Sequence, residues 1–203
     1  MALYPTLEAT PFVSINQGIE QRVLKSNFDK LGKEQVKRKW LYPKRSVGLS
    51  YSNIVNADLR ELEQFYIDRY GGFLAFTFIM PSTEISIYEG EYVGTGDGST
   101  TVYNLPFKSA TSISITVDGS PYVIGQDSTD AGDCYIIEDG GQDGVDSLVC
   151  HVTPPAGTRI ITNFTGRLAI RCRFEDTISY SRSNRNISLN DISVSLKGLL
   201  MDE

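Results

Sequence analysis

The chain has 203 residues, of which 40% are hydrophobic and 22% charged, and its formal net charge is −6. A chain of this length can bury an adequate hydrophobic core, so its stability need not depend on metals or disulfides. No stretch approaches the ~20 apolar residues that a membrane-spanning helix needs, and no basic region followed by a long apolar run opens the chain, so we expect a protein made and kept in the cytosol.

The first fifty residues are predicted to contain strands. Residues 35–40 and 46–51 are β-like stretches, and in the second one apolar residues alternate with small polar ones. Such alternation is typical of a strand with one buried face. The apolar members of the alternation are Val47, Leu49 and Tyr51.

One helix is predicted from Ala57 to about Tyr70. Asn56 is expected to be its N-cap, and Gly71-Gly72 its C-terminal stop. An apolar face arises from residues at three- and four-residue steps, namely Leu59, Leu62, Phe65, Tyr66 and Tyr70. Ile67 points to the polar side, where it either meets a neighbouring subunit or is a single exposed apolar residue.

Residues 73–80 are predicted to form a strand with large apolar side chains on both faces, ended by Pro81. A strand of this kind is covered on both sides. In a domain this small, one of the covering surfaces could belong to another chain. We therefore expect an oligomer interface that includes Phe73, Phe76 and Phe78.

Residues 92–166 differ from their flanks in charge and in texture. They contain two basic and nine acidic side chains, a net charge of −7, whereas the two flanks together carry +1. Their short β-like runs are separated by Gly, Asp and Pro turns, as in a small β-sandwich or barrel. The charge asymmetry indicates a separate module.

The expected fold class is mainly β with one main helix, an α+β chain. Residues 1–91 and 167–203 are predicted to form a split outer domain, and residues 92–166 an inserted acidic β-sandwich domain. A final strand of the outer domain is expected where Ile192, Val194 and Leu196 alternate with serines.

The sequence does not support catalysis, and we expect a non-enzymatic protein without a cofactor or metal. His151, the only histidine, has no second histidine with which to form a triad or a His-rich metal site. Gly94-x-Gly96-x-Gly98 follows no buried parallel strand and opens no helix, so we interpret it as a hairpin turn. Calcium is an alternative to solvated loop carboxylates for one acidic cluster, although EF-hand spacing is missing. The cluster comprises Asp127, Asp130, Asp133, Asp139, Asp143 and Asp146.

The cysteines Cys134, Cys150 and Cys172 are odd in number and widely spaced, and they contain no CxxC pair. This pattern argues against a disulfide framework or a zinc site. We expect three reduced, partly buried thiols. A bridge between Cys134 and Cys150 on neighbouring strands is left open as an alternative.

Two further sets of side chains are candidates for binding. Basic residues alternate along the strands between positions 33 and 45, which scatters their charge over both faces and favours salt bridges to adjacent subunits over nucleic acid. From this region we include Lys37, Lys39 and Trp40 in the expected interface. Aromatic rings also stack on sugar faces, although packing within their own domain is the favoured role for such tyrosines. The candidate saccharide contacts are Tyr92, Tyr103, Tyr122 and Tyr135.

The segment from Gly32 to Pro81 carries a combined pattern of motifs. It contains GKEQVKRKWLYPKR at residues 32–45, then a strand, then a helix and an aromatic strand. The helix and the aromatic strand carry Asp58-Leu59-x-x-Leu62-x-x-Phe65-Tyr66 and Arg69-Tyr70-Gly71-Gly72-Phe73-x-x-Phe76-x-Phe78-x-x-Pro81. In order and spacing this pattern resembles a family of phage tail proteins, which includes the lambda-type minor tail protein M and the distal tail protein of gene transfer agents. The opening of the inserted domain, residues 93–101, is similar to small β domains found inside such proteins.

This resemblance implies a structural virion protein with a tail-tube-like fold, assembled in the host cytoplasm into a hexameric ring at the tail tip. The implied partners are further copies of the chain, the tail tube protein above and a tip hub or baseplate protein below, with a tail fibre as a further candidate. Genome DNA would pass the lumen without specific binding. The alternative function is a receptor- or saccharide-binding tail adhesin module.

Overall fold

A computed structural model describes residues 2–7, 14–20, 23–27, 34–38, 42–175, 177–182 and 190–199. This part of the chain is mainly β with one α-helix, so the predicted fold class is confirmed. The chain divides into two compact units. The sandwich unit comprises Met1–Pro5, Ala75–Cys172 and Leu200–Glu203, and the helix unit comprises Thr6–Leu74 and Arg173–Leu199.

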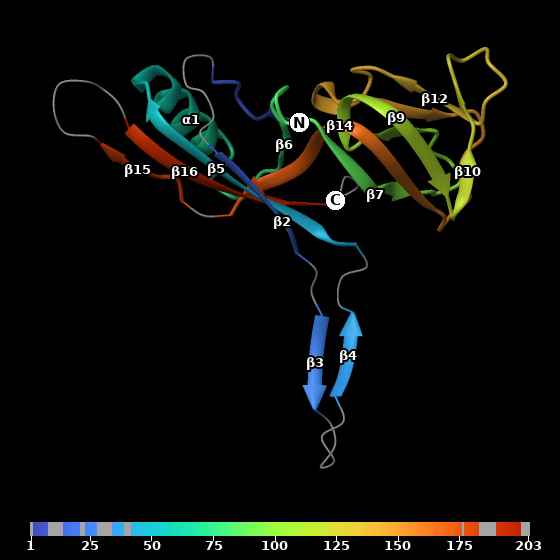
Figure 1. Cartoon of the computed structure of the whole chain (residues 1–203), viewed down its shortest axis with the longest axis horizontal. Coiled ribbons are helices and arrows are strands. Elements are labelled where there is room, and N and C mark those ends of the chain that lie inside the picture. Colours follow the sequence, from blue (N-terminus) through green and yellow to red (C-terminus); the bar gives the residue numbers. More distant parts are fainter. Residues whose placement is uncertain are drawn as a thin grey trace. The chain divides into compact units, whose positions relative to one another are not determined.

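The helix unit contains strands in the order β15–β16–β5–β2 (Figure 1). Their bounds are Ser179–Arg182 for β15, Asn190–Gly198 for β16, Lys44–Ile54 for β5 and Ser14–Glu20 for β2. The two stretches with alternating apolar residues pair with each other, and all six apolar side chains are buried. Both predicted strands are therefore confirmed. The pairs across this ladder are Ile192–Tyr51, Val194–Leu49 and Leu196–Val47.

A separate two-stranded antiparallel sheet is formed by β3 (Val23–Asn27) and β4 (Glu34–Arg38). Strand β4 covers most of the strand predicted at residues 35–40. Lys39 and Trp40 lie outside the described residues.

The helix, α1 (Asn56–Asp68), begins at the residue that was expected to cap it. Val55 occupies the N-cap position and makes no side-chain cap hydrogen bond, so the capping role predicted for Asn56 is wrong. Tyr70 and Gly71 have φ angles of 51° and 63°, and this left-handed turn ends the helical path. No helix in the described ranges is long and apolar enough to cross a membrane.

The apolar face of α1 is buried in part as predicted. Leu59 and Leu62 are buried, and the rings of Phe65 and Tyr66 lie 6.0 and 5.0 Å from that of Phe174. Tyr70, expected on the same face, is instead 76% exposed. The physical reason is that the helix ends at Asp68, and the left-handed turn then directs the chain away from the helical periodicity.

In the sandwich unit, β6 (Phe76–Ile79) pairs in parallel with β1 (Ala2–Leu3) and antiparallel with β14 (Arg159–Phe174). Phe76 and Phe78 are 0% and 1% exposed, and the ring of Tyr4 lies 5.9 and 5.3 Å from theirs. The same chain thus covers this strand. Phe76 and Phe78 belong to the core and are not available for the expected interface with another chain.

The rest of the sandwich unit consists of two sheets. One has the order β7–β14–β9–β10 (Figure 1), and the other has the order β11–β12–β13–β8. Stacked and tilted contacts of Phe164 with Tyr88 and Phe107, at 5.0 and 4.5 Å between ring centroids, build the aromatic core. The remaining bounds are β7 Ser86–Thr95, β8 Val102–Asn104, β9 Phe107–Val117, β10 Ser120–Tyr122, β11 Ile124–Gly125, β12 Cys134–Ile137, the 3₁₀ turn Gln142–Gly144 and β13 Ser147–Cys150.

Both predicted domain boundaries lie inside strands. Strand β7 crosses 91/92 and β14 crosses 166/167, whereas the compact units divide the chain after Leu74 and Cys172. Gly166 is a close-approach position within β14, because a Cβ there would lie 2.8 Å from Ala110. The compact units therefore differ from the predicted domains.

The glycine pattern at residues 94–98 does not form the predicted hairpin, because β7 and β8 belong to different sheets. The segment instead connects the two sheets. A Cβ at Gly96 would lie 2.5 Å from the carbonyl oxygen of Pro155, so the loop needs glycine there. The carboxylate of Asp97 accepts hydrogen bonds from the N–H groups of Thr100 and Ser99 at 2.6 and 2.7 Å, which hold its pKa well below the usual range.

Candidate functional site

The polar groups considered for chemistry make structural contacts. His151 is exposed, and its ring lies 5.4 Å from that of Tyr135. Asp127 accepts hydrogen bonds from the hydroxyl and the N–H of Thr129 at 2.6 and 2.7 Å, which lower its pKa. In the described part of the chain, no group of three or more His, Cys, Asp or Glu side chains is placed to hold a metal ion.

Asp146, interpreted from the sequence as a solvated carboxylate, is only 2% exposed. Its two carboxylate oxygens accept hydrogen bonds from the N–H groups of Ser109 at 3.0 Å and Asp139 at 3.1 Å. Both donors have positive φ, 51° and 54°, which residues with a side chain seldom adopt. Asp146 therefore holds two unfavourable backbone positions, and burial raises its pKa. Local sequence could not reveal this role, because Ser109 is far away along the chain.

The residues predicted to form an oligomer interface do not share one environment. The two phenylalanines of β6 are core residues, and Lys39 and Trp40 lie outside the described residues. Lys37 is exposed on β4. Among the aromatic residues of this set that the structure describes, Phe73 is the exposed one, at 76%.

Three large exposed apolar side chains follow one another at the C-terminal end of α1. We call Ile67, Tyr70 and Phe73 the helix-end surface; they are 62%, 76% and 76% exposed. The N–H of Tyr70 donates to the carbonyl of Ile67 at 2.8 Å, and the N–H of Phe73 to that of Tyr70 at 3.4 Å, so the three occupy successive tight turns. Contiguous exposed apolar patches mark interaction sites on globular proteins, and these three residues are the candidate for such a patch in the helix unit.

Tyr70 also carries backbone strain. Its φ of 51° places a bulky aromatic residue in the left-handed region, which costs on the order of 1 kcal/mol. Helices often end with one residue in this conformation, usually glycine, so the tyrosine side chain and not the turn itself is unusual here. The sequence indicated an interface role for Phe73, left it open for Ile67 and placed Tyr70 in the core.

Strand β2 forms an end of its sheet. It pairs with β5, and among the described strands no other pairs with it. Its Ile19 side chain is 65% exposed. A sheet edge presents unpaired N–H and C=O groups, which can bind a strand of another chain.

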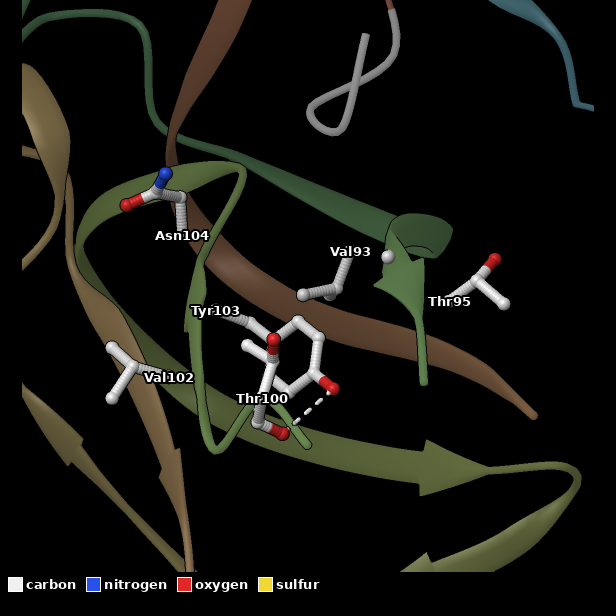
Figure 2. Close-up of a pocket in the computed structure, with 7 residues that line it drawn as sticks. Val93, Thr95, Thr100, Val102, Tyr103 and Asn104 are labelled. Carbon is white, nitrogen blue, oxygen red and sulfur yellow. Dashed lines mark hydrogen bonds between the residues drawn. The ribbon is translucent and has the colours of Figure 1, made fainter. Parts of the chain in front are cut away.

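A pocket of about 260 Å³ is lined by residues of β7, β8 and the segment between them (Figure 2). The hydroxyl of Tyr103 donates to the carbonyl oxygen of Thr100 at 3.0 Å, as the dashed line in Figure 2 shows. Burial, with a smaller contribution from the charge of Asp97, raises the pKa of Tyr103 to about 12. The pocket is smaller than the ~300–1,000 Å³ of typical ligand sites.

The four tyrosines considered for saccharide binding are not gathered in this pocket. Tyr103 lines it, whereas the hydroxyl of Tyr92 lies 2.6 Å from that of Thr95 and the ring of Tyr135 contacts His151. Tyr122 is partly buried, and burial raises its pKa. The described geometry thus offers no multi-ring platform formed by these four residues.

Comparisons with known proteins do not identify a family. No family model matches the chain, and no curated protein matches it. A functional proposal therefore depends on the helix-end surface, on the position of β2 at the end of its described sheet and on the sequence pattern between Gly32 and Pro81.

Proposed function

We propose that this chain is a structural virion protein, a distal tail protein that forms a hexameric ring at the tip of a long-tailed phage or a phage-like particle. The observation that carries the proposal is the helix-end surface. It lies within the segment that resembles phage tail proteins, and it exposes three large apolar side chains beside a strained backbone. Groups of this kind favour association with another protein surface.

The geometry of ring closure explains why such a surface would be needed. A contact between the helix-end surface of one copy and a different surface of the next repeats by rotation, and a repeated head-to-tail contact can close into a ring. The edge of β2 that pairs with no other described strand supports the same proposal, because pairing through it would continue the sheet from one subunit into its neighbour.

The ring would join the tail tube to the tip hub or baseplate, with DNA passing through its lumen. A net charge of −6 suits a channel that must not hold DNA, since each phosphate neutralised by Lys or Arg adds affinity. The proposed function requires no cofactor and no catalytic residue.

A receptor- or saccharide-binding module is the second candidate. Tyr103 on the pocket wall favours it, because aromatic rings stack on sugars. The small volume of the pocket and the engaged Tyr103 hydroxyl oppose it. A glycan titration combined with native mass measurement separates the two: a ring without glycan binding supports the tail protein, and a monomer that binds glycan supports the adhesin.

Replacing Tyr70 with glycine should weaken assembly without unfolding the chain. Glycine adopts positive φ readily, so loss of strain offsets the greater entropy of the unfolded chain, and we expect stability to change by less than about 1 kcal/mol. Losing the ring of an interface tyrosine should weaken each subunit contact at least about tenfold. Analytical ultracentrifugation over a concentration series measures assembly, and urea unfolding measures stability.

The matched control is Ile87→Ser, which removes an exposed apolar side chain, 72% exposed, in the sandwich unit. It should leave both assembly and stability unchanged. If Tyr70→Gly assembled at the same concentration as the wild type, the helix-end surface would not be the contact between subunits.

A further inference from the structure

Cys134 and Cys150 lie directly opposite each other on adjacent antiparallel strands. Strand β12 pairs with β13, and the register matches Cys134 with Cys150. Both thiols are free in this structure and both residues are buried, at 0% and 3% exposure. Cys172 has no cysteine opposite it, because its partner on the neighbouring strand β6 is Phe76.

The backbone hydrogen bonds show whether Cys134 and Cys150 form a hydrogen-bonded or a non-hydrogen-bonded pair of the antiparallel ladder. The N–H of Cys134 donates to Val123 at 3.3 Å and that of Cys150 to Thr101 at 2.8 Å, so neither donates to the other cysteine. The adjacent bond from the N–H of His151 to the carbonyl of Asp133, at 3.0 Å, completes the pattern of a non-hydrogen-bonded pair. In such pairs the Cα atoms are ~4.5 Å apart and the side chains are close.

That spacing suits a disulfide, which needs Cα atoms ~4.4–6.8 Å apart. The alternation along both strands also places the two side chains on one face of the sheet, with Leu148 on the same face of β13. Bond formation would therefore need rotation of the side chains and little movement of the strands.

We propose that Cys134 and Cys150 form a redox-controlled disulfide across β12 and β13, made in an oxidising environment by exchange with a small disulfide such as oxidised glutathione. This modification site goes beyond the proposed function and does not depend on it. Cytosolic thiols are kept reduced, whereas cross-links persist outside the cell.

The exchange balances in two steps. The thiolate of Cys150, the more exposed of the pair, attacks one sulfur of glutathione disulfide, breaks its S–S bond and releases one glutathione thiolate. The thiolate of Cys134 then attacks the Cys150 sulfur of the mixed disulfide and releases the second glutathione. The protein loses two protons and two electrons, and the glutathione disulfide is reduced to two thiols.

The cross-link would close the segment between β12 and β13. This segment contains Asp139 and Asp146, whose hydrogen bond connects its two ends at 3.1 Å. Separation of β12 from β13 would then require reduction of the disulfide as well as loss of the hydrogen bonds between the two strands. Oxidation should therefore raise the melting temperature of the sandwich unit.

The environment of the two thiols predicts slow, pH-dependent oxidation. Burial raises the pKa of Cys134 to about 12 and that of Cys150 to about 11. The titratable side chains that interact electrostatically with the two thiols are Asp133, Tyr103 and Tyr122, each of which is neutral when protonated and negative when ionised. Because the thiolate is the nucleophile, the rate should rise about tenfold per pH unit between pH 7 and 9.

The test incubates the folded full-length chain with oxidised glutathione, denatures it in an alkylating agent and maps the cysteines by mass spectrometry. We expect a mass loss of about 2 Da before alkylation, a peptide that links Cys134 to Cys150, and complete alkylation of Cys172. Dithiothreitol should reverse the rise in melting temperature. Cys172→Ala should behave like the wild type, and Cys150→Ala should show no rise.

The proposal is overturned if both cysteines remain alkylatable after oxidation of the folded chain, or if either pairs with Cys172. A rate that does not change with pH would also contradict attack by the buried thiolates. These measurements on the wild-type chain remain decisive if an alanine variant fails to fold.

Discussion

Replacing Phe78 with alanine is expected to lower the free energy of unfolding by about 3–5 kcal/mol. Phe78 is 1% exposed, and its ring meets that of Tyr4 edge-on at 5.3 Å. Truncation leaves a cavity between β6 and the N-terminal segment that the neighbouring backbone can fill only in part. Globular domains have a total stability of ~5–15 kcal/mol, so this loss is a large fraction of the total. Urea unfolding followed by fluorescence measures the change.

Phe73→Ala is the matched control for this experiment. It removes the same side chain from a site that is 76% exposed in the single chain, so below the concentration at which the chain assembles we expect a change within about 0.5 kcal/mol. Equal destabilisation of the monomer by the two variants would show that Phe73 is buried within the single chain. An unchanged Phe78→Ala variant would contradict the placement of β6 in the core.

Replacing Asp146 with alanine should destabilise the chain by about 3 kcal/mol, because hydrogen bonds to a charged group contribute ~1.5–3 kcal/mol each and two part-buried hydrogen bonds are lost. The donors, Ser109 and Asp139, both have positive φ and depend on the carboxylate for their position. Differential scanning calorimetry measures the loss. Glu138→Ala, at an exposed neighbouring position, should have little effect.

The raised pKa of Asp146 also predicts how this loss depends on pH. Burial favours the protonated form of Asp146 in the folded chain and so raises its pKa. The pH-dependent contribution of Asp146 to folding stability is therefore fully present below its unfolded pKa and is lost as pH rises through the folded pKa. The advantage of the wild type over Asp146→Ala should therefore be larger near pH 4 than at pH 7.

The contribution of Asp127 to folding stability is expected to depend on pH in the opposite direction. Its pKa is lowered by hydrogen bonds from Thr129, so its contribution is present above the unfolded pKa and is lost as pH falls. The advantage of the wild type over Asp127→Ala should shrink on acidification. If the advantage of the wild type over both alanine variants changed in the same direction with pH, the environments described for the two aspartates would be contradicted.

The elements that sequence could predict are those in which local pattern and packing agree. The alternation in β5 and β16 identified both strands, and their apolar residues are paired across the ladder. The three- and four-residue spacing of apolar side chains located the helix, but it did not identify the N-cap residue. Tyr70 was placed on the apolar face because the periodicity continues through it, and only the backbone angles show that the helix has ended.

The remaining errors concern partners that are distant in sequence. Phe76 and Phe78 were expected to need a second chain, because nothing in residues 73–80 reveals that Tyr4 covers them. Gly166 resembled a domain junction, yet it is a point where β14 closely approaches Ala110. The pairing of Cys134 with Cys150 was considered, but only the register of β12 and β13 places the two thiols opposite each other.

The central claim is that the chain assembles into a closed ring, and native mass spectrometry of the purified protein tests it most directly. The account predicts a discrete species of six copies, and negative-stain images of the same sample should show a ring with a central channel. Tyr70→Gly should shift that species toward monomer. A wild-type protein that stays monomeric at every concentration measured would contradict the account.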